Sequence, residues 1–358
     1  MKRPEKHRNS RLCLSPAFFI KGVKDMDHLH DIIPELSAEE KQVLATIRNV
    51  EGSAYRKEGT TMLLKADGSS VGMLSSGCLE GDLQCRIEDV HAKGPQAVSY
   101  DMRGYRELSW GEGTGCNGVI EVLLEPVTKA LATSMRRMHA AVNQGKTVLR
   151  WTAAAGGGWF VCGEEPDEQA KQLAAQAAGM KRGSGRSSIS DGQGEKIYVQ
   201  TIRPKPRLFI FGSGPDARPL VQMAMRCGYE VTVLDWRPAY LDAVKNEVPE
   251  ARQIPGFPDE WWRSTAFRNG DMAVVMTHHF ERDREALVHL LQEPMAYIGV
   301  LGSKTRTKRL LQTEVLPEII TTPIGLSIGA EGPEEIAVSV VGQLIALQNS
   351  ATANEVMA

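Results

Sequence analysis

The stretch RLFIFGSGPDA, residues 207–217, decides the fold of the second half of this chain. Its apolar run Leu208–Phe211 is typical of a buried strand, and the glycines and Asp216 that follow it form a tight turn into a helix. A second apolar strand, Glu230–Leu234, ends at Asp235. Strand, glycine turn, helix, strand and acid in this order predict a βαβ unit with parallel strands.

The same alternation of strands and helices continues toward the C-terminus. We expect strands at Met272–Met276, Ala296–Val300 and Ile324–Ile328, and helices at Pro219–Arg226, Arg282–Leu291, Lys304–Val315 and Pro333–Leu347. Alternating elements of this kind form a doubly wound sheet. The expected fold class is therefore α/β, with a C-terminal Rossmann-like doubly wound parallel sheet and a smaller N-terminal α+β domain.

The N-terminal half mixes short strands and helices. Asp67-Gly68 between two apolar runs predicts a β-hairpin, and the apolar residues after Cys78 recur at helical spacing. We expect a helix from Met26, strands at Lys41–Val50, Arg56–Leu64, Val71–Leu74 and Val119–Leu124, a helix over Leu79–Val90 and another at Thr128–Val142.

At about 150 residues per domain, the 358 residues suit two domains. Residues 181–196 are turn-rich and poor in apolar side chains, which indicates a mobile loop. The expected division is a flexible segment 1–25, an N-terminal domain 26–144, a bridging segment 145–205 with this loop, a Rossmann-like domain 206–350 and a tail 351–358. Within the bridging segment we expect strands at Thr147–Thr152, Trp159–Val161 and Ile197–Ile202 and a helix at Glu168–Ala178.

Composition excludes several classes of protein. Lysine and arginine number 42 against 44 acidic residues, so the net charge of −2 gives no footprint for nucleic acid. The six cysteines include no CxxC pair, which excludes a zinc ribbon, and they are too sparse for a disulfide-stapled secreted protein. No apolar run reaches the roughly 18 residues of a membrane span, and no signal peptide is evident. We therefore expect a cytoplasmic protein that contacts no membrane.

The glycine turn of the Rossmann-like domain is a candidate cofactor site. Gly212 and Gly214 permit close approach of a phosphate to the backbone, and the N-terminus of the following helix attracts an anion. Asp235 stands 21 residues after Gly214, where an acid holds ribose hydroxyls in such folds. The alternative is a nucleotide-type fold that has lost its ligand.

Polar residues follow two further strands of the predicted sheet. His278 and Asp283 follow one predicted strand, and Gly302 and Ser303 follow the next. The carboxyl ends of parallel strands border the ligand crevice, so all four are candidate cofactor-binding residues. We expect His278 to act by hydrogen bonding rather than as a metal ligand; a loop histidine that is satisfied within the protein is the alternative.

Two cysteines lie in glycine-rich turns of the N-terminal domain. Gly77-Cys78-Leu79-Glu80 opens a predicted helix, whose N-terminus favours the thiolate form of a cysteine. Gly115-Cys116-Asn117-Gly118 forms the second turn. Cys78 and Cys116 could contact one soft metal or a sulfur-bearing ligand, with Gly77, Glu80, Gly115, Asn117 and Gly118 as further candidate cofactor-binding residues. The alternative is two unrelated buried thiols.

Together these residues resemble the xanthine dehydrogenase accessory protein family (XdhC/CoxI). The matching stretches are Ser76–Asp82, Gly115–Pro126, Leu208–Gly214, Val231–Pro238, Val275–Asp283, Ile298–Lys304 and Pro323–Val340. The two glycine-flanked cysteines of the family match Cys78 and Cys116. Many members carry GCGG where this chain has Asn117 and GAGH where it has Pro215. Asn117 still tolerates a left-handed turn, whereas Pro215 has no amide proton to offer a phosphate.

The resemblance implies a chaperone that binds molybdenum cofactor (molybdopterin), with Cys78 and Cys116 near the molybdenum or the transferred sulfur. It further implies a homodimer that supports sulfuration by a cysteine desulfurase and insertion into xanthine dehydrogenase or a related molybdenum hydroxylase. Whether the chain is an enzyme stays open, but no general acid–base constellation stands out, which favours a carrier. Two alternatives remain: an oxidoreductase with NAD(P) or another nucleotide in the Rossmann cleft, and a scaffold whose Rossmann domain is empty.

Overall fold

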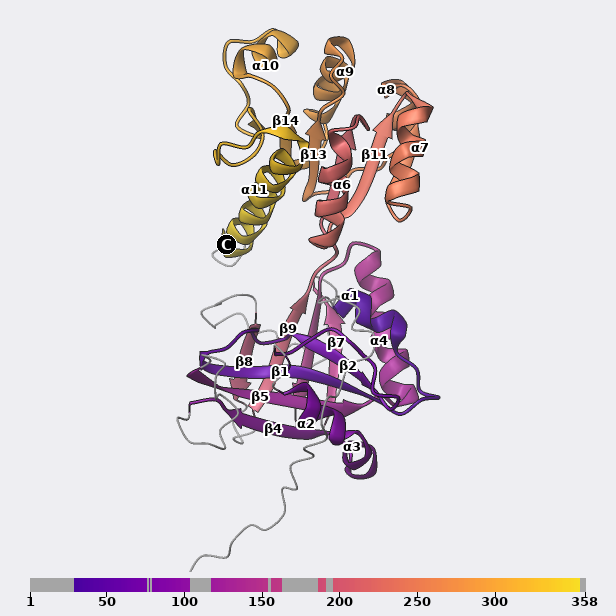
Figure 1. The fold of residues 1–358 in the computed structure, drawn as a ribbon, viewed down its shortest axis with the longest axis vertical. Helices are drawn as coiled ribbons and strands as arrows, with labels where there is room; N and C mark the ends of the chain where they lie inside the picture. Colours follow the sequence, from indigo (N-terminus) through magenta and orange to yellow (C-terminus); the bar gives the residue numbers. More distant parts are fainter. Residues whose placement is uncertain are drawn as a thin grey trace, which may run out of the picture. The chain divides into compact units, whose positions relative to one another are not determined.

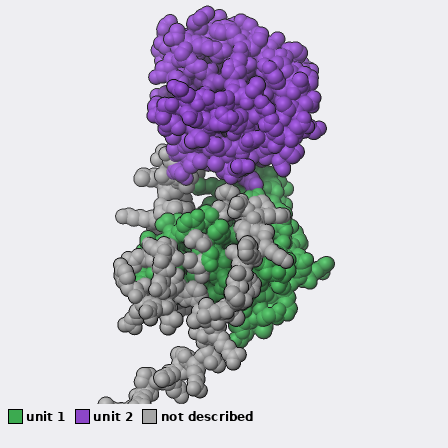
Figure 2. Space-filling view, viewed as in Figure 1, with its two compact units in different colours: residues 1–204 green, residues 205–358 purple. Residues whose placement is uncertain are grey.

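A computed structural model describes residues 29–75, 77, 79–103, 117–153, 156–162, 186–190 and 196–354. The chain divides into two compact units, residues 1–204 and 205–358, and each is described by itself (Figure 2). Residues 1–25, the helix expected at Glu168–Ala178, and the candidate site residues Cys78, Gly115 and Cys116 lie outside the described residues.

A parallel sheet of six strands forms the second unit (Figure 1). Its strands are β10 (Arg207–Phe211), β11 (Glu230–Asp235), β12 (Arg252–Pro255), β13 (Asp271–Val275), β14 (Met295–Val300) and β15 (Ile320–Thr321). Their order is β12-β11-β10-β13-β14-β15, and every neighbouring pair is parallel. The chain winds outward in both directions from β10 and β13, so the carboxyl ends of these two strands form the switch point. The expected Rossmann-like fold is confirmed.

Helices cover both faces of this sheet. On one face, α6 (Ala217–Arg226), α7 (Pro238–Glu247) and α11 (Gly332–Asn354) share a buried apolar cluster with the strands. On the other face, α8 (Pro258–Ser264), α9 (Phe280–Leu290) and α10 (Lys304–Leu311) share a second cluster. The helix α11 includes residues 351–354, which the sequence assigned to a tail.

The prediction of a strand at Ile324–Ile328 is wrong. The last strand, β15, ends at Thr321, and the residues after it form a loop. Gly325 has a φ of 95°, far from the negative φ of a regular strand. The N–H of Leu326 donates to the carbonyl of Ser339 in α11 at 3.2 Å, so this apolar segment is hydrogen-bonded to a helix and not to the sheet.

An antiparallel sheet of five strands organises the first unit. Its strands are β1 (Gln42–Ser53), β2 (Thr61–Lys65), β3 (Ser70–Val71), β4 (Gln96–Asp101) and β5 (Asn117–Pro126), in the order β3-β2-β1-β5-β4. The predicted hairpin joins β2 to β3, and Asp67 Oδ1 accepts a hydrogen bond from the N–H of Ser69 at 2.9 Å in its turn. The strand β4, which alternates between exposed and more buried residues, was not expected.

Two short helices, and not the single one expected over Leu79–Val90, pack on one face of this sheet. They are α2 (Glu80–Cys85) and α3 (Ile87–Lys93), separated by Arg86. Leu79, Leu83, Ile87 and Val90 are all buried against the sheet, so the predicted apolar face is confirmed although the helix is interrupted.

The opposite face of this sheet carries the remaining helices and a second antiparallel sheet. The elements are α1 (Leu29–Ile32), the 3₁₀ helix η1 (Ile33–Glu35), α4 (Lys129–Asn143), β6 (Val148–Ala153), β7 (Gly156–Val161), β8 (Arg186–Ser190) and β9 (Lys196–Ile202). The order of this second sheet is β7-β6-β9-β8. The side chain of Thr128 caps α4 by accepting from the N–H of Leu131.

The strand β8 corrects the loop that we expected over residues 181–196. Residues 186–190 pair with β9 in an antiparallel register, from Arg186 opposite Gln200 to Ser190 opposite Lys196. This ladder is satisfied by backbone groups, so it does not need the apolar side chains whose scarcity predicted a loop. The described part of the bridging segment therefore belongs to the first unit.

Candidate functional site

The glycine turn after β10 lies at the switch point of the parallel sheet. Gly212 has a φ of 112°, and a Cβ there would lie 2.6 Å from the carbonyl oxygen of Met276 at the end of β13. Its N–H donates to the carbonyl of Leu234 in β11. Gly212 is thus required by the close approach of two neighbouring strand ends, independently of any ligand.

Asp235 is fully buried and its carboxylate is engaged by the protein itself. The N–H and hydroxyl of Ser213 donate to Oδ2 at 2.6 and 2.9 Å. Arg237 donates from its backbone N–H and Nε to Oδ1, both at 2.9 Å, and from Nη2 to Oδ2 at 2.7 Å. Burial opposes ionisation, but these hydrogen bonds outweigh it and lower the pKa of Asp235 below its ordinary value. A ribose could reach this carboxylate only by displacing Ser213 or Arg237.

A second carboxylate occupies the N-terminus of α6. Asp216 is the residue before the first helical turn, and its Oδ2 lies 2.6 Å from Nε2 of His278. His278 is exposed and has a φ of 61°, an uncommon conformation for a non-glycine residue. Gly214 lies against the same carboxylate, because a Cβ there would be 2.8 Å from Asp216 Oδ1. The position that binds pyrophosphate in dinucleotide folds therefore carries a negative charge of its own.

The candidates at the next strand ends are also engaged within the protein. Asp283 is buried and accepts from the N–H of Thr277 at 3.1 Å, from its hydroxyl at 2.5 Å and from Nη2 of Arg306 at 2.6 Å. The Ser303 hydroxyl caps α10 by accepting from the N–H of Arg306 at 3.2 Å. Gly302, with a φ of 133°, makes the turn before it.

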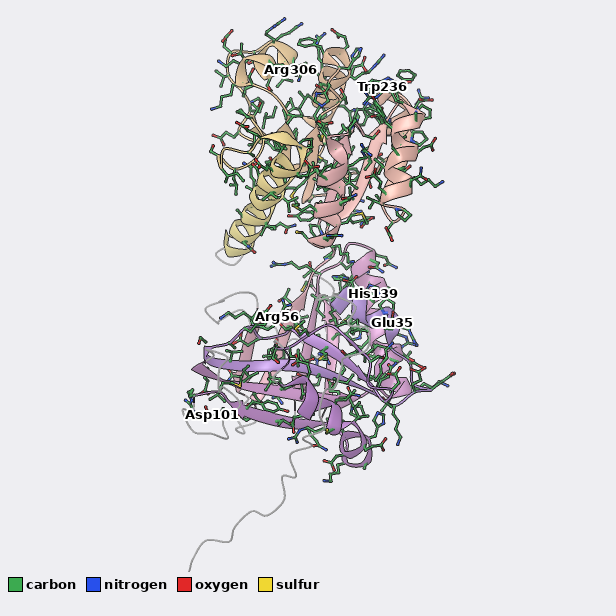
Figure 3. All side chains as sticks on the ribbon, viewed as in Figure 1. Glu35, Arg56, Asp101, His139, Trp236 and Arg306 are labelled. Atoms are coloured by element: carbon green, nitrogen blue, oxygen red, sulfur yellow. The ribbon has the colours of Figure 1, made fainter. Side chains whose placement is uncertain are left out.

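Aromatic and basic side chains also lie at this edge of the sheet. Trp236 and Arg306 both lie toward the carboxyl edge of the sheet (Figure 3). The rings of Trp236 and His279 meet edge to face with centroids 5.8 Å apart, and the guanidinium of Arg237 stacks over Trp236 at 4.5 Å. Among the described residues, no group of three His, Cys, Asp or Glu side chains could hold a metal ion.

In the first unit, Glu80 closes the turn that contains Cys78 in the sequence. Its carboxylate is buried, and Oε1 accepts from the N–H groups of Leu74 and Ser75 at 3.1 and 2.7 Å. Oε2 accepts from the N–H of Leu79 at 3.2 Å and from the Ser75 hydroxyl. Four donors therefore converge on one side chain. This makes Glu80 a positioning residue for the turn.

Gly77, the described neighbour of Cys78, is exposed and has a φ of 105°. Among the described residues, apart from its chain neighbours, no heavy atom lies within 4 Å of the place where its Cβ would be. A glycine therefore suits this position for its backbone conformation, and its surface is open to an approaching molecule.

The strand after Cys116 is tied to the helix after Cys78. Tyr100 of β4 donates its hydroxyl to Asp82 Oδ2 of α2 at 2.6 Å, and Tyr100 pairs with Ile120 of β5. Asp82 also accepts from Nε of Arg86 at 2.6 Å. Burial and the neighbouring Asp82 carboxylate both raise the pKa of Tyr100, so this hydroxyl stays protonated as a donor. Asp82 and Ile120 each follow one of the two cysteines by four residues.

The residues after Cys116 begin β5. Asn117 pairs with Ser53 at the far end of β1. Gly118 has a packing reason to be glycine, because a Cβ there would lie 2.5 Å from the carbonyl oxygen of Glu51 in the neighbouring strand. Part of the glycine richness that suggested a ligand turn thus has its origin in a close strand contact.

Several residues that shape these sites were not singled out by the sequence. Arg237 and Asp216 both lie within quoted motifs, but nothing in their spacing reveals which acid or histidine they contact. The position of Asp82 indicates only a favourable charge at a helix start, and Tyr100 lies in the strand that was missed. The spacing of apolar residues shows which face of a helix or strand is buried, but it does not show which distant residue a polar side chain contacts.

Comparison with known proteins matches both units to one family. Residues 36–101 match the model described as "XdhC and CoxI family", and residues 208–344 match "XdhC Rossmann domain". A protein of Bacillus subtilis (strain 168), described as a probable component of xanthine dehydrogenase, is 40% identical over 89% of this chain and 97% of its own length. The "Molybdenum cofactor insertion chaperone PaoD" of Escherichia coli (strain K12) is 24% identical over 86% of this chain and 83% of its own length.

A solved structure shares the fold. The crystal structure of a protein described as a xanthine dehydrogenase, from Bacillus halodurans, superposes with a TM-score of 0.77 at 38% sequence identity. The match covers 91% of this chain and 96% of that one.

Proposed function

This chain belongs to the XdhC and CoxI family, and from that premise we propose that it is an accessory protein that carries molybdenum cofactor. It holds the cofactor while a cysteine desulfurase supplies the sulfido ligand, and it delivers the product to xanthine dehydrogenase or a related molybdenum hydroxylase. It works in the cytoplasm as a homodimer and turns over no substrate alone. Among the described residues, no helix is long and apolar enough to cross a membrane.

The hydrogen bond from Tyr100 to Asp82 carries this proposal. It fastens α2, the helix that follows Cys78, to β4, which pairs with β5, the strand that begins directly after Cys116. Two thiolates on one ligand suit a soft metal or a sulfur atom in transfer. We propose that Cys78 and Cys116 contact the molybdenum centre or its incoming sulfur.

The described part of the Cys78 turn fits such a cargo. Gly77 leaves its outer surface open, and Glu80 fixes the backbone on the inner side through four hydrogen bonds. A turn whose inner side is fixed by hydrogen bonds and whose outer side is accessible can present a thiolate to a large ligand without reorganisation on binding. Gly115, Asn117 and Gly118 are proposed to form the facing wall.

The competing proposal of an NAD(P)-dependent oxidoreductase has less support from the geometry. Asp235, which would hold the ribose, is neutralised by Arg237, and Asp216 places a carboxylate where a pyrophosphate would bind. His278, the exposed histidine after β13, is paired with Asp216. We propose instead that Gly212, Gly214, Asp235, Asp283, Gly302 and Ser303 stabilise this edge of the sheet, where His278 and His279 are exposed and Trp236 is partly buried.

Analysis of co-purifying cofactor tests the proposed function. The full chain is purified from a host that makes molybdenum cofactor, and molybdenum and molybdopterin are measured per protomer. We expect close to one of each for the wild type and a loss of about tenfold for Cys78→Ser or Cys116→Ser, equivalent to about 1.4 kcal/mol. Cys227→Ser, an exposed cysteine of the second unit, is the matched control and should retain the cofactor. Full retention by both cysteine variants would contradict the thiol contacts.

A further inference from the structure

A small pocket lies beside the Cys78 turn, between the five-stranded sheet and α2. It has a volume of about 90 Å³ and is lined by Met62, Gly68, Ser70, Gly77, Glu80, Gly81 and Gln84. Met62 and Ser70 come from β2 and β3, and Glu80, Gly81 and Gln84 come from α2. Because Gly77 and Glu80 flank Cys78 in the sequence, a ligand in this pocket would lie next to that turn.

The hydroxyl of Ser70 points to a ligand. Ser70 is 3% exposed, and its Oγ has no hydrogen-bond partner in the described part of the chain. Ser70 pairs with Leu64 across the hairpin, and Leu64 is buried in the cluster under α2. Paired residues of antiparallel strands point to the same face, so the Ser70 side chain faces the pocket. A buried hydroxyl without a partner is unfavourable, and a ligand that bonds to it would remove that cost.

The charges around the pocket select the kind of ligand. Glu80 contributes a buried carboxylate to one wall, which disfavours a phosphate or another anion there. Gln84 donates its Nε2 to the carbonyl of Lys65 at 2.6 Å, so its Oε1 is the amide atom left to accept from a ligand. The pocket therefore favours a neutral group with N–H donors that can also bond to a hydroxyl.

The size of the pocket further limits which ligands it can bind. About 90 Å³ equals roughly three water volumes of ~30 Å³ each, enough for one edge of a heterocycle but not for a whole bicyclic ring. Around the opening, no atom of the described residues outside the local chain lies within 4 Å of the Cβ positions of Gly68, Gly77 and Gly81. An inserted ring could thus continue outward past these glycines.

We propose that this pocket binds the aminopyrimidinone edge of a pterin, with Ser70 and Gln84 as its hydrogen-bonding partners and Met62 against the ring. This inference rests on the proposed function, since it assigns one end of molybdopterin to the first unit. The pterin edge offers N–H donors and a carbonyl acceptor, the complement of the groups in the pocket. Its phosphate would then lie away from Glu80, outside the pocket.

Two variants separate binding from folding. Ser70→Ala removes a hydroxyl that bonds to no described residue, so it should fold as well as the wild type. Gly81→Leu adds a side chain at a helical position with open space around its Cβ, which fills the pocket without strain on the fold. Ala92→Leu, at an exposed position of α3, adds equal bulk away from the pocket and serves as the control.

Binding of 6-hydroxymethylpterin to the full chain, followed by pterin fluorescence, tests the proposal. We expect saturable binding to the wild type and to Ala92→Leu, about tenfold weaker binding to Ser70→Ala, and no binding to Gly81→Leu. Inorganic phosphate should not compete. The proposal would be overturned by equal binding to all four proteins or by competition from phosphate. It would also be overturned if the wild type does not bind the pterin, because the pocket then holds ordered water only.

The molybdopterin content of the same proteins keeps this inference separate from the proposed function. If the wild type carries molybdopterin and the Ser70 and Gly81 variants carry as much, the assignment of this pocket to the pterin is wrong while the carrier function stands. If the wild type carries none but binds 6-hydroxymethylpterin through Ser70, the carrier function fails while the pocket assignment stands.

Discussion

Replacement of Glu80 by glutamine should loosen the turn that contains Cys78. The carboxylate accepts from Leu74, Ser75 and Leu79, with two donors at each oxygen. If Oε1 becomes the amide nitrogen, the N–H groups of Leu74 and Ser75 lose their acceptor. If Oε2 does, the Ser75 hydroxyl loses its acceptor, while the N–H of Leu79 keeps its bond of 3.0 Å to the Ser75 hydroxyl oxygen. In both cases the remaining bonds lose the charge of their acceptor. An unsatisfied buried donor costs about 1–3 kcal/mol, and bonds to a charged group are stronger than bonds to a neutral one. We therefore expect a local loss of about 3 kcal/mol for Glu80→Gln.

Hydrogen exchange followed by mass spectrometry measures this loss where it occurs, since a chain of two units need not unfold in one step. A loss of about 3 kcal/mol corresponds to exchange about a hundredfold faster in peptides that cover Leu74–Leu79. Glu88→Gln is the control: Glu88 is exposed and forms an ion pair with Lys41 at 2.6 Å, and the loss of such a surface pair should cost less than about 1 kcal/mol. If exchange in the turn is no faster in Glu80→Gln than in the control, Glu80 does not position the turn.

Three further predictions concern the backbone, the acid response and the crevice. Gly212→Ala should destabilise the second unit by about 3 kcal/mol in thermal unfolding, because the new Cβ would lie 2.6 Å from the carbonyl oxygen of Met276 and Gly212 has a positive φ. The control Gly81→Ala should be neutral or stabilising by up to about 1 kcal/mol, and equal effects of the two substitutions would contradict the geometry. The lowered pKa of Asp235 contributes stability that is present above the ordinary pKa of 3.8 and is lost as the pH falls through the folded-state pKa. Arg237→Met removes the cation that lowers this pKa, so the pH midpoint of acid unfolding should rise, and an unchanged midpoint would refute this. Calorimetric titration with NAD and NADP should give no saturable binding at millimolar concentrations, and a measurable dissociation constant for either would favour the oxidoreductase.

The fold could be predicted where local chemistry and global topology agree. The turn between Phe211 and Ala217 needs a positive φ that glycine supplies at Gly212, and it lies between a strand and a helix in the structure as expected. Asp67-Gly68 likewise specifies its hairpin through the conformation of two residues. Such signals are carried by the residues that form the turn, so a single sequence suffices to find them.

The errors in the fold come from elements that depend on distant partners. The strand β8 exists because Lys196–Ile202 offers it a ladder, and its own residues have little apolar content. Conversely, Ile324–Ile328 has the composition of a strand, but Gly325 adopts a positive φ and the segment bonds to α11. Propensity is a weak guide where tertiary hydrogen bonds decide the outcome.

The candidate site shows the same division. The sequence located the glycine turn and the strand ends beside it, and Asp235 does end its strand as expected. Nothing in a linear pattern reveals that Arg237 folds back onto this carboxylate. The sequence suggests that Glu80 is a binding residue near Cys78, whereas its four hydrogen bonds make it the support of the turn. Spacing identifies which residues are near a site; burial and partners decide what each one does there.

Transfer of cofactor from this chain to an acceptor enzyme tests the account most directly. The full chain, loaded with molybdenum cofactor and freed of unbound molybdenum, is mixed with a cofactor-free xanthine dehydrogenase, and hydroxylase activity and the molybdenum on both proteins are followed together. We predict that activity rises as molybdenum leaves this chain, one atom for each site activated. Molybdenum that stays on the chain while the acceptor remains inactive, or a chain that never acquires the cofactor, would contradict the account.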